Sequence, residues 1–413
     1  MTRVVVVGGG IAGLAFARTL SRSLGVDANV VVVESGTDEP GRGRHAFNDP
    51  SRTHRDSTVV RTGERGAEWY PRARGVGGGA LINGRLALVR RADHWFPMHG
   101  GRRWSWSEME KHLRAIPIVE HNIADFSRWA AVATQAATEA GWRVVPTQLL
   151  EGDVRGGFEI RTDFHAASLV EEDGCIRGVL STTGAVEYAD RVVLAAGALA
   201  SPGLMGARAL STTVRHHGLK DHPAVCFEWQ GSEERHHGVG IVLEQDDIQI
   251  VTMHEGNRIV MVGAALRVDS TGFMEWQSGK LVFDFQMLQD QRDVDRLDRC
   301  MNEMIRLVKS TIPFAGGAVR CGTERTSLDE LELMSMNERV RWLCRNTSGN
   351  WHAACSMPMG DSGVVDHDGR VVGYENLWCC DASVLTDLPQ SPTQLPVMIA
   401  ASEIARRFAA TTS

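Results

Sequence analysis

The sequence predicts a mixed α/β fold that combines a parallel sheet with a second, mostly antiparallel sheet. Near its start, a β-branched run leads through a glycine-rich loop into a helical pattern. From Val225 to about Cys344, short strand patterns follow one another without helices between them. The last part returns to a strand pattern at 376–381 and a helical pattern at 395–408. Parallel strands need helical crossovers and consecutive strands favour antiparallel pairing, so two kinds of sheet are expected.

The length of the chain indicates a globular protein with more than one domain. At roughly 150 residues per domain, 413 residues correspond to two or three domains. We expect a discontinuous nucleotide-binding domain formed by residues 1–224, with connecting segments near 85–157, and by residues 345–413. Residues 225–344 are expected to form the substrate-binding domain.

Charge and hydropathy exclude two classes of partner. The net charge of −7 leaves no basic excess for nucleic acid. No apolar run approaches the roughly 18 residues of a membrane span, and the first apolar stretch is too short for a secretory signal. The eight cysteines have no framework spacing. We therefore expect reduced thiols, no membrane span and a cytoplasmic location.

The first elements form a dinucleotide-binding fingerprint. Val4–Val7 has the composition of a buried strand, Gly8 to Gly13 fits G-x-G-x-x-G, and 14–24 has helical spacing. Gly8 permits the tight turn, Gly10 lets a pyrophosphate approach, and Gly13 lets the helix pack on the strand. The N-terminus of the helix then offers free N–H groups to phosphates. This order of elements predicts a Rossmann-like fold.

A carboxylate ends the next strand pattern. Residues 30–33 are four valines, and Glu34 follows them, 21 residues beyond Gly13. That position suits a carboxylate that accepts hydrogen bonds from an adenosine ribose, and its charge disfavours a 2′-phosphate. These residues alone do not distinguish FAD from NAD.

A second glycine-dense segment spans 74–84 and leads into Asn83. Glycines at this density either let the backbone approach a flat ligand closely or mark a surface loop. The preceding residues, 37–74, have no sustained periodicity and are expected to be irregular. The remaining predicted elements are helices at 105–115, 126–140 and 294–312, and strands at 158–170, 176–180, 191–194, 225–229, 240–244, 248–254, 259–268 and 280–285.

Taken together, four blocks resemble the glucose-methanol-choline (GMC) oxidoreductases, FAD enzymes that oxidise alcohols. The N-terminal fingerprint is shared with many flavoproteins. The segment 74–84 resembles the family's second glycine signature, and 191–205 with 218–223 resembles its central A-G-A and D-H-P segments. The C-terminal block is the most specific, with His352, Met359-Gly360, Val364 to Asp366, Asn376-Leu377 and Asp381 to Ser383 in the family order.

The resemblance implies FAD as the cofactor and assigns residues to it. Some relatives attach FAD covalently through a histidine before the asparagine, but Ile82 stands there in this chain. Non-covalent FAD is therefore expected. The ADP half would contact Gly8, Gly10, Ala12, Gly13 and Glu34; Gly78 and Asn83 would face the flavin; Ala166, Gly197, Asp381 and Ala382 would complete the site.

The resemblance also implies the catalytic pair. Alcohol oxidation needs a base for the hydroxyl proton beside the hydride acceptor, and imidazole suits this at neutral pH. His352 occupies the family's base position, and Gln394 falls where relatives have a second His or Asn. The alternatives are a core histidine and a glutamine that bonds the start of a helix. His222 is expected to have a structural role near FAD.

Other histidines and tryptophans have weaker patterns. The pairs His216-His217 and His236-His237 are expected in solvated loops, and no metal spacing accompanies them. Trp95, Trp104, Trp106 and Trp351 could either line a wide aromatic mouth or pack in the core.

Departures from the family pattern bear on the substrate. The chain is shorter than relatives commonly are, and the G-x-R-x-S-A stretch expected near 149–157 is missing. A reduced lid favours a bulky or glycosylated alcohol. The electron acceptor, dioxygen or another, stays open. The alternative is a non-redox, lyase-like enzyme with structural FAD, because related folds host such chemistry.

Overall fold

A parallel sheet forms one half of the molecule. The computed structural model describes residues 2–25, 28–38, 53–54, 59–61, 66–90, 105–121, 128–150, 156–209, 216–231, 236–278, 280–311 and 318–411. Five strands lie in the order β10-β2-β1-β14-β25, and every pairing between them is parallel. They are β10 (Glu159–Arg161), β2 (Ala28–Val33), β1 (Thr2–Val7), β14 (Arg191–Leu194) and β25 (Leu377–Cys379).

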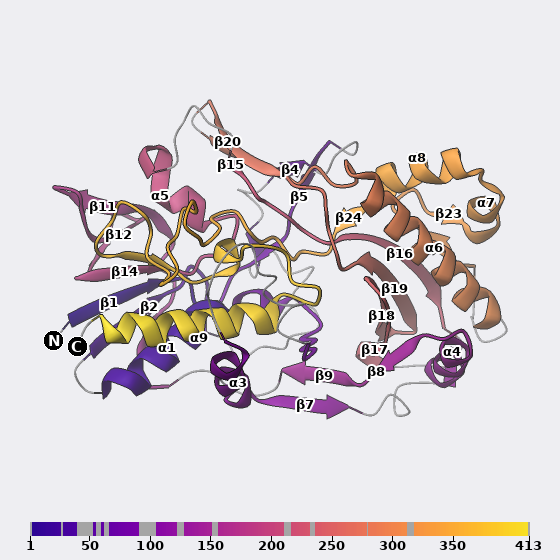
Figure 1. The fold of residues 1–413 in the computed structure, drawn as a ribbon, viewed down its shortest axis with the longest axis horizontal. Helices are drawn as coiled ribbons and strands as arrows, with labels where there is room; N and C mark the ends of the chain where they lie inside the picture. The colour runs from indigo at the N-terminus through magenta and orange to yellow at the C-terminus, as the bar shows by residue number, and fades with distance from the viewer. Residues whose placement is uncertain are drawn as a thin grey trace.

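The centre of this sheet is fully buried. Val4 to Val7 are at most 2% exposed, as expected for a strand covered on both faces. Helix α1 (Ile11–Leu24) and helix α9 (Gln394–Ala410) lie side by side along one face (Figure 1). Phe16 of α1 meets Phe408 of α9 edge to face at 5.5 Å. The first and last helices of the described chain therefore cover the same strands.

A mostly antiparallel sheet forms the other half, as the sequence predicts. It runs β23-β22-β16-β19-β18-β17-β8, with β24 paired to β16. Helix α6 (Gln291–Thr311) and helix α4 (Arg128–Glu139) lie against it, and helix α8 (Met336–Asn346) packs on α6 (Figure 1). The strands are β8 (Arg143–Val145), β16 (Pro223–Gln230), β17 (His236–Gln245), β18 (Ile248–Gly256), β19 (Arg258–Ala265), β22 (Arg320–Cys321), β23 (Thr326–Ser327) and β24 (Ser348–Gly349).

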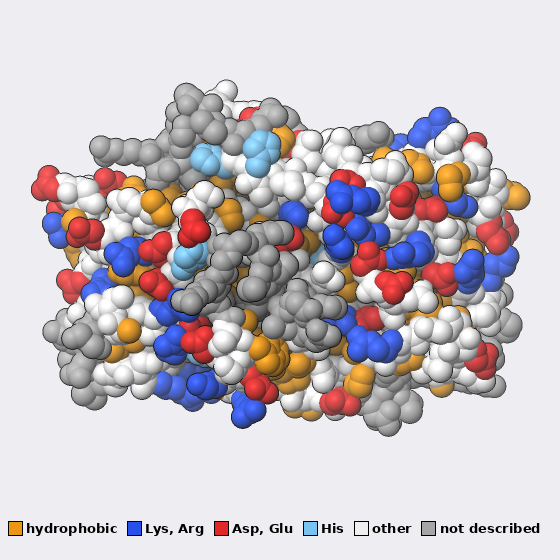
Figure 2. All heavy atoms as spheres, in the orientation of Figure 1, with side chains coloured by type: hydrophobic (Ala, Val, Ile, Leu, Met, Phe, Trp, Pro, Cys, Tyr) orange, Lys and Arg blue, Asp and Glu red, His pale blue; other side chains and the backbone are white. Residues whose placement is uncertain are grey.

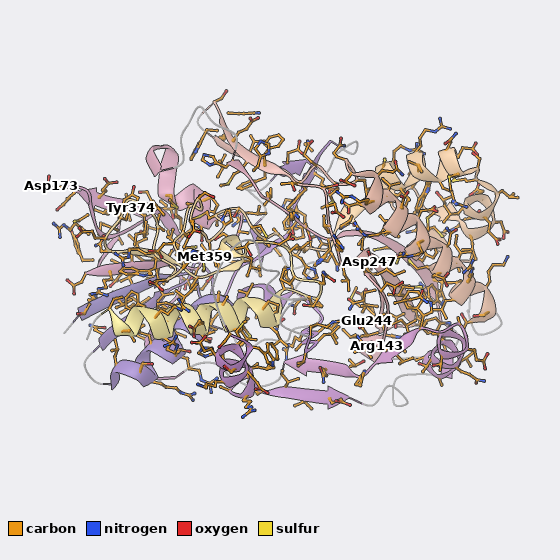
Figure 3. All side chains as sticks on the ribbon, viewed as in Figure 1. Arg143, Asp173, Glu244, Asp247, Met359 and Tyr374 are labelled. Atoms are coloured by element: carbon orange, nitrogen blue, oxygen red, sulfur yellow. The ribbon has the colours of Figure 1, made fainter. Side chains whose placement is uncertain are left out.

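Strand β8 brings a part of the predicted connecting segment into this sheet. Arg143 pairs with Glu244 of β17 across the ladder, and their side chains form an ion pair. Figure 3 shows these two residues in the half of the molecule opposite Asp173, which lies in the hairpin between β11 and β12. That hairpin belongs to a small sheet of β11 (Ala166–Glu172), β12 (Cys175–Ser181) and β13 (Val186–Tyr188).

The expectation of an irregular segment at 37–74 is wrong for its described part. Strand β4 (Val59–Arg61) pairs with β5 (Ala67–Trp69) and, in parallel, with β21 (Lys280–Asp284). Because one partner lies over 200 residues away, local periodicity did not reveal these short strands. The sheet is completed by β20 (Phe273–Gln277) and β15 (His216–His217), while β3 (Thr53–His54) pairs with β6 (Arg72–Ala73) and β7 (Ile118–His121) with β9 (Thr147–Leu150).

Two more expectations need correction. The predicted strand at 158–170 is two strands, β10 and β11, interrupted where Asp163 adopts a left-handed backbone with φ +57°. His216-His217 and His236-His237 lie in β15 and at the start of β17 rather than in loops. The remaining elements are α3 (Trp106–Arg114), α5 (Ser201–Ala209), α7 (Leu328–Leu333) and the 3₁₀ turns η5 (Gly78–Leu81) and η8 (Ala382–Val384).

The described surface mixes charges of both signs. On the face in Figure 2, acidic and basic side chains are interspersed rather than gathered into one basic patch. Within the described ranges, no helix has the length and apolarity that crossing a bilayer requires. None of the eight cysteines, all of which lie in the described ranges, forms a disulfide, and five are buried.

Candidate active site

The two glycine loops lie against each other. Gly10 and Gly77 form a parallel bridge, and the Gly77 N–H donates to the Gly9 carbonyl at 2.7 Å. Gly78 has φ +52°, and a Cβ there would lie 2.7 Å from the Gly10 Cα. A side chain at Gly78 would thus force the loops apart.

A cavity of about 830 Å³ opens where these loops meet. Most of the residues that sequence reasoning assigned to the cofactor line it: Gly8, Gly10, Ala12, Glu34, Gly78, Asn83, Ala166, Gly197, Asp381 and Ala382. Gly13 is not among the lining residues. A Cβ at Gly13 would lie 2.0 Å from the Gly8 carbonyl oxygen, so this glycine lets α1 pack closely on the turn.

Glu34 ties three loops together at one end of the cavity. It is 7% exposed, and its Oε1 accepts from the Gly36 and Gly75 N–H groups at 2.9 and 3.0 Å. Its Oε2 accepts from the Gly9 N–H at 2.8 Å. A carboxylate has roughly four acceptor directions, two on each oxygen, so Oε2 keeps one for a ligand.

Asp381 joins the turns that follow β14 and β25. Its Oδ2 accepts from the Gly197 N–H at 2.8 Å and the Ser201 hydroxyl at 2.5 Å. Its Oδ1 accepts from the Ser383 N–H at 2.9 Å. The carboxylate is 2% exposed, so its main effect is to shape the cavity wall.

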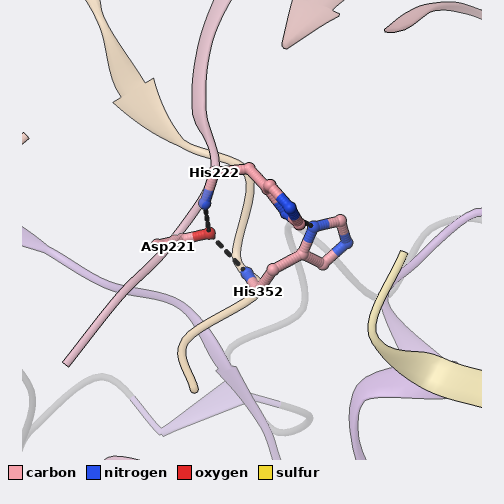
Figure 4. Close-up of side chains that lie close together, drawn as sticks. All are labelled: Asp221, His222 and His352. Atoms are coloured by element: carbon pink, nitrogen blue, oxygen red, sulfur yellow. Dashed lines mark hydrogen bonds between the residues drawn. The ribbon is translucent and has the colours of Figure 1, made fainter. Parts of the chain in front are cut away.

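His352 lies on the same cavity and meets a second imidazole. The Nδ1 atoms of His352 and His222 are 2.9 Å apart, with the two rings nearly perpendicular at 88° (Figure 4). Figure 4 shows the other nitrogen of the His352 ring pointing away from His222. His222 was expected to have a structural role near the cofactor; the described contact is with His352 itself.

Asp221 anchors both histidines through their backbones. Its Oδ1 accepts from the His222 N–H at 2.7 Å and from the His352 N–H at 2.9 Å (Figure 4). The Tyr70 hydroxyl donates to Oδ2 at 2.7 Å and accepts from the Ala353 N–H at 3.0 Å. Burial raises the pKa of Asp221 to about 7, against these hydrogen bonds, which favour the ionised form. Burial and the nearby Asp221 also hold the pKa of Tyr70 well above its usual value.

Both imidazoles are neutral near pH 7. Burial lowers the pKa of His222 to about 4, and Lys220 contributes in the same direction. Burial, and next the neighbouring His222, hold the pKa of His352 well below its usual value. A neutral imidazole has one nitrogen free to accept a proton, which a general base requires.

Gln394 is the first residue of α9 and lines the cavity. Its Oε1 accepts from Asn83 Nδ2 at 2.8 Å, and Asn83 Oδ1 accepts from the Arg85 N–H at 2.8 Å. Gln394 is 4% exposed, and its Nε2 has no hydrogen-bond partner among the described residues. Because its bonded partner is Asn83, the alternative of a glutamine that bonds the helix start is not what the structure describes.

Aromatic side chains form part of the cavity wall. Trp351 lines the cavity and is 46% exposed, with φ +57°. Trp276 and Phe283 reach the cavity from the β20–β21 hairpin, a contribution that sequence reasoning missed. Trp106 opens α3 and packs against the core, whereas Trp95 and Trp104 lie outside the described residues.

Sequence reasoning also missed Tyr70 and the anchoring role of Asp221. Asp221 was inside the recognised D-H-P block, which was a usable signal. Tyr70 follows Trp69 in a segment without periodicity, and no local pattern connected it with a residue 151 positions later.

Residues 268–401 match the family model of the GMC oxidoreductases, and residues 6–64 match that of an NAD(P)-binding Rossmann-like domain. The chain therefore contains a region similar to the GMC oxidoreductases and a Rossmann-like region. Its C-terminal match contains His352, Asp381 and Gln394.

Relatives with GMC-type names or activities align with nearly the whole chain. An uncharacterised GMC-type oxidoreductase of Mycobacterium tuberculosis is 26% identical over 97% of this chain and 75% of its own length. A 5-(hydroxymethyl)furfural oxidase of Methylovorus sp. is 23% identical over 97% of both chains. The crystal structure of a pyridoxine 4-oxidase from Mesorbium loti has a TM-score of 0.80 at 20% identity, covering 99% of both chains. The structural likeness establishes the same fold.

GMC oxidoreductases bind FAD, and the described residues fit that group. The glycine cradle of Gly8, Gly10 and Gly78 admits backbone approach to a pyrophosphate and a flat ring. Glu34 keeps an acceptor for a ribose hydroxyl, and the buried Gln394 Nε2 lacks a protein partner. These features of the cavity fit a bound dinucleotide.

Proposed function

We propose that this protein is a GMC oxidoreductase that oxidises an alcohol to an aldehyde or ketone, with His352 as the general base. The observation that carries the proposal is that two polar side chains with complementary hydrogen-bonding roles line the same cavity. His352 presents the ring nitrogen that does not contact His222, and Gln394 presents an amide nitrogen without a protein partner. One is suited to accept a proton and the other to donate a hydrogen bond.

The two side chains divide the work on the substrate oxygen. His352 takes the hydroxyl proton on Nε2 as the C=O bond forms. Gln394 donates from Nε2 to the oxygen and stabilises the negative charge that develops there. Because the amide cannot take up the proton, His352 acts as the single base. When bound, FAD would supply the two-electron acceptor for the hydride released from the carbinol carbon.

We propose further that FAD is held without a covalent bond to the protein. Ile82 lines the cavity beside Asn83 and has no nucleophilic atom with which to attach a flavin. Precipitation in acid should release all the yellow colour into the supernatant. Colour that stays in the pellet would contradict non-covalent binding.

The proposed substrate is a bulky alcohol with a planar ring. Trp276, Phe283 and Trp351 give the cavity an aromatic wall, on which such a ring can stack. The name of the Methylovorus relative, a 5-(hydroxymethyl)furfural oxidase, agrees with a ring-bearing alcohol. Glycosylated alcohols belong in the same substrate screen.

Anaerobic reduction of the flavin tests the function. Ring-bearing alcohols should bleach the visible absorbance of the wild-type holoenzyme, and a later screen with dioxygen and artificial acceptors identifies the oxidant. His352→Ala should retain flavin, and its rate of bleaching should be at least about 100-fold lower, the usual scale of general base catalysis. His367→Ala is the matched control, because His367 is not among the residues that line the cavity and contacts Asp361 on the surface. Flavin that no alcohol bleaches would favour the lyase-like alternative.

A further inference from the structure

The ring of His222 is fixed by two main-chain carbonyl groups. Its Nε2 lies 2.9 Å from the Pro389 oxygen and 3.2 Å from the Leu266 oxygen. A carbonyl oxygen accepts hydrogen bonds and cannot donate them. The proton of neutral His222 therefore resides on Nε2, where both oxygens attract it.

This assignment leaves Nδ1 of His222 as an acceptor. The side chain is 0% exposed, so its neutral form has one ring proton, and Nε2 already holds it. The lowered pKa of His222 agrees with this, since burial disfavours a second proton. Nδ1 can only accept a hydrogen bond in this state.

The proton between the two rings must then come from His352. Its Nδ1 lies 2.9 Å from the bare Nδ1 of His222, and a hydrogen bond at that distance needs one donor. His352 is thereby held as the tautomer protonated on Nδ1. Its Nε2, on the opposite side of the ring, keeps the free electron pair.

We propose that His222 is a positioning residue that sets the tautomer of His352, so that the nitrogen facing the cavity is always the basic one. The order of control runs from the carbonyl groups of Pro389 and Leu266, through His222, to Nε2 of His352. The consequence for turnover rests on the proposed alcohol oxidation, but the tautomer itself does not.

The same contact serves His352 after it takes up the hydroxyl proton. The cationic ring then donates from Nδ1 to a neutral acceptor, and a hydrogen bond from a charged donor is stronger than a neutral one. Asp221 holds the backbones of the two histidines close together because its Oδ1 accepts from both of their N–H groups. His222 thus orients the base in both protonation states without losing its own proton.

Two variants separate hydrogen bonding from packing. His222→Asn places an amide oxygen near the position of Nδ1 and so retains an acceptor, whereas His222→Leu has similar bulk and no acceptor. We expect kcat of the flavin-loaded His222→Leu enzyme to fall about 100-fold, the scale of a general base contribution. His222→Asn should recover most of that loss. Equal kcat values for both variants would overturn the proposal.

The second readout is spectroscopic and needs no substrate. In the oxidised holoenzyme labelled with ¹⁵N-histidine, long-range ¹H–¹⁵N correlations show which ring nitrogen has the proton. The His352 signals are assigned from their disappearance in His352→Gln. We expect a protonated Nδ1 and an unprotonated Nε2. A proton on Nε2 of His352 would overturn the proposal even if alcohols are oxidised. The expected tautomer in an enzyme that oxidises no alcohol would instead overturn the proposed function alone.

Discussion

Asn83 donates a hydrogen bond from Nδ2 to Oε1 of Gln394 at 2.8 Å, across 311 positions of sequence. Asn83 is itself oriented because its Oδ1 accepts from the backbone N–H of Arg85. The amide of Gln394 must therefore present its nitrogen to the cavity. The backbone N–H of Arg85 thus fixes, through Asn83, which atom of the Gln394 amide stays unbonded among the described residues: Nε2, a hydrogen-bond donor.

Removing that donor should slow catalysis without releasing the cofactor. Gln394→Leu is expected to lower kcat/KM for a ring-bearing alcohol by roughly 100-fold, as losing one donor to a developing oxyanion does elsewhere. Steady-state kinetics on enzyme of measured flavin content checks this. Gln135→Leu, on the exposed face of α4, serves as the control. An unimpaired Gln394→Leu enzyme would remove Gln394 from the proposed mechanism.

The close approach of the glycine loops predicts that alanine at Gly78 and alanine at its neighbour Gly79 will affect FAD binding very differently. Gly78→Ala forces a Cβ to 2.7 Å from the Gly10 Cα and strains a backbone with φ +52°, so the purified protein should contain little FAD. A Cβ at Gly79 meets no protein atom within 4 Å. Gly79→Ala should therefore bind FAD as the wild type does. The ratio of visible to ultraviolet absorbance measures both, and full occupancy in Gly78→Ala would refute the argument.

The acid limb of the pH profile of kcat/KM should lie at a lower pH than the pKa of an ordinary histidine. The base acts in its neutral form, which is lost as pH falls through its folded pKa. Because burial and His222 hold the pKa of His352 well below 6.5, kcat/KM should stay constant as pH falls from 8 through 6.5. Activity should decline only at more acid pH. A half-maximal rate at or above pH 6.5, in enzyme shown to stay folded, would contradict this assignment.

Burial of neutral His222 should make the protein less stable in acid. An unfolded histidine binds its proton near pH 6.5, whereas His222 in the fold binds one near pH 4. Between these values the unfolded state holds more protons, so the free energy of unfolding falls as pH falls. The contribution is on the order of 3 kcal/mol, from about 1.4 kcal/mol per pKa unit. Urea unfolding at pH 7, 5.5 and 4 measures it, and His222→Leu should show a flatter dependence than wild type.

The sequence predicted those parts of the fold that have a local signal. The valine runs of β1 and β2 and the glycine turn between β1 and α1 have a fixed spacing and a clear physical purpose. The parallel sheet and the mostly antiparallel sheet are confirmed. The short strands β4 and β5 gave no such signal, because what stabilises them is pairing with β21 from a distant part of the chain.

The candidate site also divides into residues with a local sequence signal and residues whose contacts depend on distant parts of the chain. The fingerprint glycines and Glu34 were found by spacing, and Gly78, His352 and Gln394 by resemblance; of these residues, all but Gly13 line the cavity. What the sequence could not provide is side-chain pairing across long separations. The contact of His222 with His352 spans 130 positions, and that of Tyr70 with Asp221 spans 151. Such contacts depend on how whole elements pack, so periodicity and motif spacing have no means of predicting them.

The central place of β1 between β2 and β14 has a consequence for biosynthesis. At roughly 5–20 residues per second, a ribosome needs about 10 to 40 seconds to make the chain between Val7 and the strand that covers its open edge. Throughout that interval a four-valine segment presents unpaired amide groups to other nascent polypeptides. Slower translation or a shortage of chaperones should therefore lower the soluble yield of this enzyme before any effect on its finished form is seen.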